Sequence, residues 1–304
     1  MPDKPPAEVL IDERVVRALL AQANASIPDA ASRALTKTSE GWDSEVWRLG
    51  EDLAVRLPRR ALAAPLVLHE QRALPVVGPR IEATGIHVPI PVFAGSPSDH
   101  YPWHWSIVPW YAGTAGLHVP RAERADWAGP LAAALVALHA PAPADHPVNP
   151  VRGVPLTDRA PLVSERVALL RETHALPPSS VDALESVWRA GLAAAPWSAD
   201  PVWIHGDLHP GNLVADGGRL VALIDFGDVT AGDPAYDLAV AWLAFDARGR
   251  ARFRSALEGR HDAATWVRAR AWAATIAMML VINSDDNPDY GALGAEAIPE
   301  VLGD

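Results

Sequence analysis

The sequence predicts an α+β fold with two lobes, in which a small antiparallel β-rich lobe precedes a larger, mainly α-helical lobe. Three observations lead to this prediction. Short strand-like segments separated by turn residues fill the first third of the chain, and helical stretches fill most of the remainder. A chain of 304 residues with 49% hydrophobic content can also bury two cores. We expect residues 1–110 to form the N-terminal lobe, with a linker from about residue 107, and residues 111–304 to form the C-terminal lobe.

The N-terminal lobe is expected to begin with a helix that Asp12 caps and that runs to about residue 24. A hairpin turn at Gly50 joins two of the following strands, and Pro58 ends their ladder because proline has no N–H to donate. A helix over residues 62–74 is expected to stop at Pro75. The predicted strands are residues 34–40, 45–49, 53–57, 87–93 and 103–108.

Residues 109–113 break the strand pattern, and the chain beyond them is mainly helical. A proline-rich loop is expected over residues 141–155. A hairpin of residues 213–214 and 220–224 is expected around the turn at Gly217-Gly218. The predicted helices are residues 122–139, 162–173, 179–195, 234–245, 249–257 and 264–282.

The composition narrows the classes of partner. The chain has no cysteine, which excludes disulfides and thiolate sites, and its formal net charge of −11 argues against nucleic acid as a partner. The first residues lack the apolar core of a signal peptide, and the longest apolar run, residues 273–282, is too short to span a bilayer. We therefore expect a cytoplasmic protein without a membrane partner, and the oligomeric state stays open.

The most informative stretch is residues 205–212, HGDLHPGN, followed by an apolar hairpin and Ile224-Asp225-Phe226-Gly227. Phosphoryl transfer depends on positioning and charge neutralisation, so a few oxygen ligands make up much of such a catalyst. Asp207 lies on a glycine- and proline-rich loop, where it can orient or deprotonate an attacking hydroxyl. Asn212 and Asp225 can hold Mg²⁺, which takes few protein oxygens together with water and phosphate.

The same residues also allow ordinary structural interpretations. A lone loop aspartate such as Asp207 most often caps a helix or forms an Asx-turn, but its spacing to Asn212 and Asp225 favours catalysis. The hairpin between Asn212 and Asp225 would bring both to the same end of two paired strands. We expect His209 to brace the loop and His205 to be structural.

Three motifs together resemble the aminoglycoside phosphotransferase family, which comprises protein-kinase-like kinases of antibiotics and small metabolites and includes macrolide phosphotransferases. The motifs are residues 205–212, residues 224–227 and residues 232–239, GDPAYDLA. The resemblance implies a protein-kinase-like fold, ATP or GTP as donor, magnesium, and a hydroxylated small molecule as acceptor. It also implies that Asp237 is a buried carboxylate supporting the loop and the following helix.

The nucleotide side departs from the wider kinase pattern in one loop. The segment that would cover the phosphates has only Gly41 before the next turn, so Ser44 and backbone N–H groups would make the contacts. Asp43 in this loop has no evident role. Arg59 and Arg60 lie just beyond the following strand and are expected to be exposed to solvent.

A second departure lies on the strand at residues 53–57, which is similar to the kinase strand that carries a phosphate-binding lysine. Here that position is Arg56, which keeps the charge and adds a planar donor fork. Glu70 on the following helix is expected to orient it, although an ordinary surface glutamate is the alternative. In the linker, the carbonyl of Pro109 and the N–H of Tyr111 would pair with adenine, and guanine is not excluded.

Acceptor recognition is expected from the helical lobe, where carboxylates would favour an amino sugar and aromatic walls a macrocycle. Any single acid in this set is more often a solvated surface group. The candidates are Asp233, Trp242, Asp246, Trp272, Asp285, Asp286, Asp289 and Tyr290.

Several functions therefore remain in competition. The leading one is transfer of the γ-phosphoryl group to an antibiotic, a macrolide being slightly favoured over an aminoglycoside. A kinase of an endogenous metabolite is an alternative because fold and catalytic motifs do not fix the acceptor. A non-catalytic pseudokinase is disfavoured because Asp207, Asn212 and Asp225 are all present, and a protein kinase because no long activation segment follows Gly227.

Overall fold

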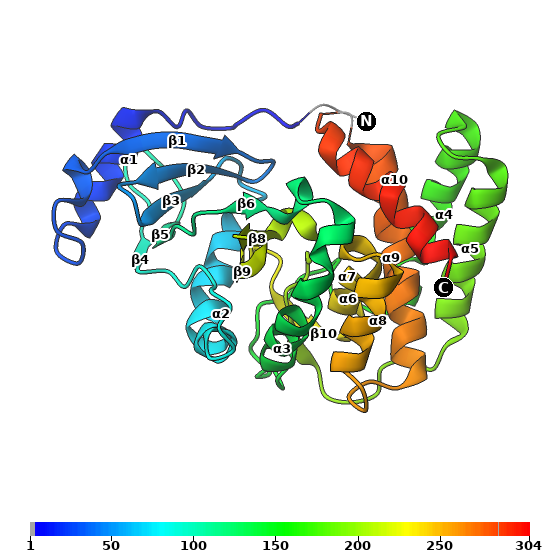
Figure 1. Ribbon diagram of the computed structural model, residues 1–304. Coiled ribbons are helices and arrows are strands. Elements are labelled where there is room, and N and C mark those ends of the chain that lie inside the picture. Colours follow the sequence, from blue (N-terminus) through cyan, green and yellow to red (C-terminus); the bar gives the residue numbers. More distant parts are fainter. Residues whose placement is uncertain (1–3, 285) are drawn as a thin grey trace.

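The computed structural model describes residues 4–284 and 286–304, and it has the predicted two-lobed α+β architecture (Figure 1). The N-terminal lobe is built on an antiparallel five-stranded sheet with the strand order β1-β2-β3-β5-β4. Its strands are β1 (Leu35–Glu40), β2 (Ser44–Leu49), β3 (Leu53–Pro58), β4 (Phe93–Gly95) and β5 (Trp105–Pro109). Pro58 is the last residue of β3, as its missing N–H predicts.

Helix α1 (Glu13–Leu20) packs against this sheet. Asp12 caps it as predicted, because its carboxylate accepts a hydrogen bond of 2.9 Å from the N–H of Val15. The buried face of α1 shares one apolar cluster with strand residues such as Trp47 and Ile107. Short 3₁₀ turns at Ala21–Ala23 and Ala30–Ser32 complete the N-terminal segment.

Helix α2 (Ala64–Glu82) corrects the prediction that the chain leaves the helix at Pro75. The helix continues through Pro75 and Pro79. A proline inside a helix costs one hydrogen bond and a steric clash, roughly 3 kcal/mol. The inner face of α2, with Leu74 and Val77, is fully buried in the large core of the C-terminal lobe, and this burial offsets the cost.

The strand expected over residues 87–93 was also predicted wrongly. Only Phe93–Gly95 forms a strand there, and before it the chain is extended with a single bridge from His87 to Ala222. Pro89 and Pro91 explain the difference, because neither can donate to a ladder.

The C-terminal lobe is mainly helical, as predicted, with α9 and α10 packed against each other and α5 beside them (Figure 1). The expected helix over 122–139 is divided into a 3₁₀ segment, Arg121–Trp127, and α3, and the one over 234–245 into α6 and α7. Helix α10 was not predicted. The helices are α3 (Ala128–Leu138), α4 (Leu156–Thr173), α5 (Pro178–Ala193), α6 (Ala235–Leu238), α7 (Val240–Ala244), α8 (Ala247–Ala256), α9 (Ala263–Asn283) and α10 (Pro288–Leu302).

Short strands of the C-terminal lobe carry the polar loops. The β8–β9 hairpin turns through Gly217 and Gly218, both with positive φ, as the predicted turn requires. A separate antiparallel pair joins β7, which ends directly before the residues 205–212 loop, to β10, which follows the β8–β9 hairpin. The strands are β6 (Thr114–Ala115), β7 (Val202–Ile204), β8 (Leu213–Asp216), β9 (Arg219–Leu223) and β10 (Thr230–Gly232), with 3₁₀ turns at Gly116–His118 and Pro210–Asn212.

Among the described residues, only α9 is long and apolar enough to pass a length-and-composition test for a membrane span. Most of the apolar stretch of this helix, 61%, is buried inside the protein. Helix α9 therefore has the character of a central core helix.

Candidate active site

The fully buried carboxylate of Asp237 anchors the backbone of the loop between β7 and β8. Asp237, on α6, accepts hydrogen bonds from the backbone N–H groups of His205 and Gly206 at 2.8 and 3.1 Å. The Nε2 atom of His139 also lies 3.0 Å from its Oδ2 atom. Charge-assisted bonds of this kind fix the backbone of the loop. The structure thus places Asp237 where the family resemblance implied a supporting role.

His205 and His209 brace the same loop from two sides. The Nδ1 atom of the buried His205 accepts from the N–H of Asp207, so its Nε2–H donates to the carbonyl of Ile224 at 3.0 Å. This bond connects the loop to the segment that carries Asp225. His209 accepts from the N–H of Gly211 at 3.0 Å, which stabilises the turn at Pro210–Asn212.

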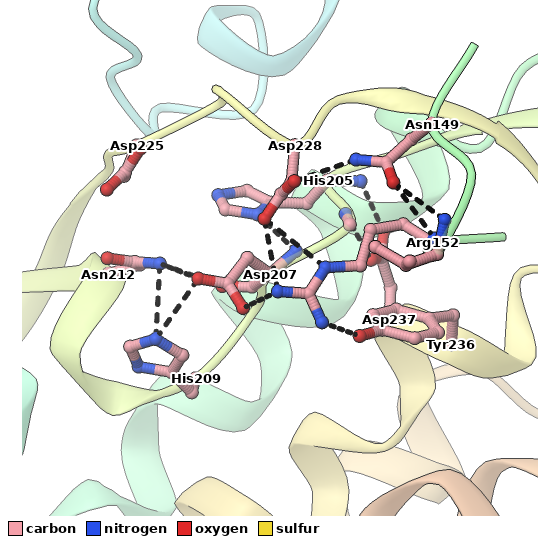
Figure 2. Close-up of polar contacts among 12 residues, drawn as sticks. Asn149, Arg152, His205, Asp207, His209, Asn212, Asp225, Asp228, Tyr236 and Asp237 are labelled. Atoms are coloured by element: carbon pink, nitrogen blue, oxygen red, sulfur yellow. Dashed lines mark hydrogen bonds and ion pairs between the residues drawn. The ribbon is translucent and has the colours of Figure 1, made fainter. Parts of the chain in front are cut away.

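Asp207 projects from this loop with about a third of its side chain exposed. One oxygen, Oδ1, is 3.2 Å from the guanidinium of Arg152, and the other, Oδ2, lies 3.5 Å from His209 Nε2 and 3.4 Å from Asn212 Nδ2 (Figure 2). Burial opposes ionisation, but Arg152 and His209 outweigh it and hold the pKa of Asp207 well below its usual range. The carboxylate is therefore ionised and ready to accept a hydrogen bond from a hydroxyl.

Asn212 and Asp225 are brought together by the hairpin, as predicted. The N–H of Ile224 donates to the carbonyl of Asn212 at 3.0 Å, so Asp225 follows directly beside it. Asn212 uses its amide nitrogen to hold Asp207, which leaves its oxygen on the side where Asp225 lies (Figure 2). Asp225 adopts a left-handed backbone with φ of 63°, which aspartate tolerates better than most residues, and half of its side chain is exposed.

This pair fits the ligand preferences of Mg²⁺. One neutral amide oxygen and one carboxylate form the sparse, all-oxygen set that leaves room for water and phosphate ligands. The described residues contain no group of three or more His, Cys, Asp or Glu side chains suited to a metal ion. Two oxygen donors suit a hard cation that takes its remaining ligands from water and from a phosphorylated compound.

Arg56 connects the two lobes across the site. Its Nη1 is 2.9 Å from Glu70 on α2, and its Nη2 is 2.5 Å from Asp225 Oδ1. Glu70 is buried, and burial raises its pKa to about 7 although Arg56 pulls in the opposite direction. The sequence-predicted pairing of Arg56 with Glu70 is therefore present, and a single guanidinium bridges it to Asp225.

The loop between β1 and β2 is held by the two arginines that were expected to be exposed. That expectation was wrong for Arg59, which is 4% exposed and bonds to the carbonyl of Gly41 at 2.9 Å. Arg60 is also partly buried and pairs with Asp43 at 2.5 Å, which gives Asp43 the structural role that the sequence did not reveal. Ser44 lies at the end of this loop as the first residue of β2.

The tip of the loop reaches the other lobe. The indole N–H of Trp42 donates to a carboxylate oxygen of Asp286, just before α10, at 2.7 Å. Arg60 also donates to the carbonyl of Trp42 at 3.2 Å. The loop therefore has a braced base and one exposed contact across the site.

The linker leaves the carbonyl of Pro109 facing away from β3. The N–H of Trp110 donates to Asp52 at 2.7 Å, and the carbonyl of Ile107 accepts from Val92 at 2.9 Å on the opposite side. Because carbonyls alternate along a strand, the carbonyl of Pro109 points to the same side as that of Ile107. Tyr111 packs its ring on His87 and donates its hydroxyl to the carbonyl of Val88.

Several of the expected acceptor residues have structural environments instead. Trp242 is 1% exposed and Trp272 is buried against Tyr236, so neither forms a wall open to a ligand. Asp233 is held in an ion pair of 2.6 Å with Arg268, and Asp246 caps α8. Sequence periodicity does not show which side of a mostly apolar helix is covered, so it could not reveal the burial of the two tryptophans. The two aspartates have local partners, an ion pair and a helix cap, that the sequence did not show.

The remaining acceptor candidates surround the start of α10. Asp286 and Asp289 are exposed, and Asp289 is 3.1 Å from His118. Tyr290 stacks edge-on against His209, with ring centroids 5.3 Å apart, which places this helix end beside the residues 205–212 loop. Asp285 lies outside the described residues.

The structure adds four residues that the sequence reasoning missed, all around Asp207 (Figure 2). Asp228 directly follows one motif and Tyr236 lies within another, so the sequence held a signal for both. The other two come from the loop before α4, where only the turn-forming Pro150 and Gly153 hint at a defined structure. The four residues are Asn149, Arg152, Asp228 and Tyr236.

The chain resembles known phosphotransferases in sequence over a limited segment. Aminoglycoside 3′-phosphotransferases from Escherichia coli and Salmonella typhimurium are each 41% identical to it over 59 residues, which is 19% of this chain and 22% of theirs. The matched segment thus spans about a fifth of the length of these curated relatives.

Solved structures share the fold over nearly the whole chain. Aminoglycoside 2′-phosphotransferase-IIIa in its GDP complex aligns with a TM-score of 0.65 and 20% identity, covering 93% of this chain and 97% of that one. Macrolide 2′-phosphotransferase type I aligns with a TM-score of 0.60 and 21% identity, covering 94% and 97%. At this identity the likeness shows a common fold.

A family model decides membership, because it covers well over half of the sequence. The model described as the phosphotransferase enzyme family matches residues 34–272, which include both lobes, the linker and all three motifs. The chain belongs to the phosphotransferase enzyme family.

Proposed function

We propose that this protein is a small-molecule O-phosphotransferase that moves the γ-phosphoryl group of ATP or GTP to a hydroxyl of an antibiotic-like acceptor. The observation that carries the proposal is the convergence of Asp207, Asn212 and Asp225 at one end of the β8–β9 hairpin, with Arg56 and Glu70 facing them. Positioning groups for a hydroxyl, a cation and a phosphate chain thus lie together.

In the proposed reaction, the acceptor oxygen attacks the γ-phosphorus while the bond from that phosphorus to the β–γ bridging oxygen breaks. The hydroxyl hydrogen-bonds to Asp207, which receives the proton as the new P–O bond forms. Asn212 and Asp225 would hold magnesium, which neutralises phosphate charge when bound. Arg56 would exchange its bond with Asp225 for one with a phosphate, with Glu70 keeping it in place. The products are a phosphate monoester and ADP or GDP.

Residues 1–110 would bind the nucleotide, and residues 111–304 would supply the catalytic loop, the metal ligands and the acceptor site. The free carbonyl of Pro109 and the N–H of Tyr111 would meet the base, and Ser44 would lie over the phosphates. GDP is bound in the solved structures of aminoglycoside 2′-phosphotransferase-IIIa, and ATP in a streptomycin ternary complex of another neighbour, so both donors belong in the test.

The acceptor would be an aminoglycoside or a macrolide, since structural neighbours of both kinds share the fold. The sequence slightly favoured a macrolide. The burial of Trp242 and Trp272 removes two residues from the expected aromatic wall, whereas Asp286 and Asp289 remain exposed. Exposed carboxylates attract protonated amines, so the structure supports an amino sugar more than the sequence did.

The test is a nucleotide-consumption assay with Mg²⁺ and either ATP or GTP, in which kanamycin and erythromycin are offered separately. We expect one antibiotic to stimulate consumption, and mass spectrometry to find that antibiotic heavier by one phosphate. Asp225→Asn is the matched control, because asparagine tolerates the same backbone conformation but removes the charge. Mg²⁺-dependent turnover without stimulation would point to an endogenous metabolite, and no turnover with retained nucleotide binding would favour a pseudokinase.

A further inference from the structure

Arg152 lies beside Asp207, although it comes from the loop before α4 and is 55 residues away in the sequence. We propose that Arg152 is a positioning residue that fixes the orientation of the Asp207 carboxylate toward the acceptor hydroxyl. The inference rests on the proposed function and deepens it, because it assigns part of the hydroxyl-orienting geometry to a segment outside the three motifs.

The loop that carries Arg152 is held in a defined conformation. The side-chain oxygen of Asn149, a buried residue, accepts from the N–H groups of Val151 and Arg152 at 3.0 and 3.1 Å. This Asx-type turn fixes the backbone from which the guanidinium projects. The amide nitrogen of Asn149 donates to Asp228 at 2.7 Å, which ties the turn to the segment following Asp225.

Two glycines let this loop approach the β7–β10 pair closely. Gly153 has a φ of 67°, in the region that favours glycine, and a side chain at this position would lie 3.0 Å from the carbonyl oxygen of Ala231. A side chain on Gly232 would lie 2.1 Å from the carbonyl oxygen of Gly153. The seating of the loop therefore depends on backbone contacts that tolerate no added bulk.

The guanidinium uses its planar fork on three partners. Nε and Nη2 both donate to Asp228 Oδ2, at 3.2 and 3.1 Å, and Nη1 donates to the hydroxyl of Tyr236 at 2.5 Å. Nη2 also reaches Asp207 Oδ1 at 3.2 Å (Figure 2). Two partners thus fix the guanidinium, and its remaining bond fixes one oxygen of Asp207. The other oxygen faces His209 and Asn212, so the carboxylate is restrained on both sides.

A comparison with Arg268 separates positioning from ordinary structural pairing. Arg268 and Asp233 form a buried pair whose side chains are 5% and 12% exposed. Arg152 and Asp207 are 21% and 32% exposed, so their pair is open toward the site. A misplacement of about 1 Å in a reacting group can cost on the order of 100-fold in rate, which makes such a restraint consequential.

The experiment uses the full-length protein with Mg²⁺, the preferred nucleotide, and kanamycin or erythromycin, whichever supports turnover by the wild type. Arg152→Ala is expected to lower kcat by about 100-fold with the nucleotide KM within about threefold of wild type. Arg152→Lys should have a kcat between those of the wild type and Arg152→Ala, since lysine restores the positive charge on a single nitrogen but not the planar fork. Added guanidinium ion at millimolar concentration should raise the turnover of Arg152→Ala but not that of Asp207→Ala.

Arg270→Gln is the matched control, because Arg270 is another partly buried arginine of the same lobe that bonds to the carbonyl of Val301 and not to Asp207. Its kcat should stay near that of the wild type, and thermal unfolding should show every variant folded. An Arg152→Ala enzyme as fast as the wild type would overturn the inference. So would equal losses in Arg152→Ala, Arg152→Lys and Arg270→Gln without guanidinium rescue. Wild-type protein inactive with every acceptor would instead count against the proposed function.

Discussion

The two walls of the candidate active site, the residues 205–212 loop of the C-terminal lobe and the β1–β2 loop of the N-terminal lobe, differ in how firmly their conformations are fixed. On the C-terminal side, Asp207 stands on a loop whose backbone is bonded to the fully buried Asp237, and neighbouring side chains restrain both of its oxygens. On the N-terminal side, the β1–β2 loop is braced at its base by Arg59 and Arg60, but its tip makes one exposed bond to Asp286.

This difference matches two requirements of the proposed reaction, a rigid site for the acceptor hydroxyl and an adjustable loop for the nucleotide. Groups that orient a hydroxyl gain from preorganisation, because every misplaced atom raises the barrier. A loop that covers nucleotide phosphates must let the nucleotide enter and leave, so weak, solvent-exposed contacts suit it. Arg56 lies between the two regimes, since one guanidinium joins Glu70 of α2 to Asp225.

The most severe test of the rigid wall is Asp207→Ala. Loss of the group that we propose orients and deprotonates the hydroxyl should lower kcat by about 10²–10⁴-fold while nucleotide affinity stays nearly unchanged. Turnover assays together with calorimetric titration of the nucleotide measure both. If affinity falls in parallel with kcat, Asp207 is holding the fold of the loop and the contrast between the two walls fails.

Asp237→Ala should act on stability before it acts on chemistry. It leaves the N–H groups of His205 and Gly206 without their acceptor in a buried region, at about 1–3 kcal/mol for each group left unsatisfied. Urea unfolding should therefore show a lower midpoint. Asp246→Ala, which removes a helix cap on α8 outside the site, serves as the comparison and should cost about 1 kcal/mol. Equal shifts would mean that the catalytic loop is no better supported than a surface helix.

Arg56→Lys tests the residue between the walls. A single ammonium group cannot reproduce the ion pair with Glu70 and the hydrogen bond to Asp225, which separate guanidinium nitrogens make, and one charge-assisted hydrogen bond is worth about 1.5–3 kcal/mol. We expect kcat/KM for the nucleotide to fall by about tenfold or more, measured at saturating acceptor. Unchanged kinetics would show that the position supplies charge alone.

Trp42→Phe should have the smallest effect. It removes the donor to Asp286 while keeping an aromatic ring, and an exposed hydrogen bond contributes about 0.5–1.5 kcal/mol. We expect a change of a few-fold in the KM for the acceptor and a thermal midpoint lower by no more than about 2–4 °C. A double-mutant cycle with Asp286→Ala isolates the contact. A loss in kcat as large as that of Arg56→Lys would show that the loop tip belongs to the rigid part of the site.

The sequence predicted the site best where its residues are close together in the chain. Asp207, Asn212 and Asp225 lie on either side of a short hairpin, so local pairing alone brings them together. The sequence did not predict the role of Arg152, because its position depends on long-range packing and no local pattern encodes its contact with Asp207.

The two-lobed fold was confirmed (Figure 1), and the details that the sequence did not predict share one physical cause. Pro75 normally ends a helix, but the burial of Leu74 and Val77 in the other lobe carries α2 past it. Trp242 and Trp272 were candidates for an aromatic wall at the acceptor, but both are buried, and the sequence of a mostly apolar helix does not show which face is covered. The sequence thus predicted the clustering of catalytic side chains within one short segment, but not which partner each apolar helix face packs against.

The separation of Arg152 from the motifs has a consequence for recombination and protein engineering. Asn149 and Arg152 precede α4, whereas Asp207, Asp228 and Tyr236 all follow β7. A chimera with its crossover anywhere between residues 153 and 202 would inherit the complete motif block from one parent and its arginine loop from the other. Such hybrids would carry every signature of an active enzyme and still turn over slowly, unless both parents supplied the same loop.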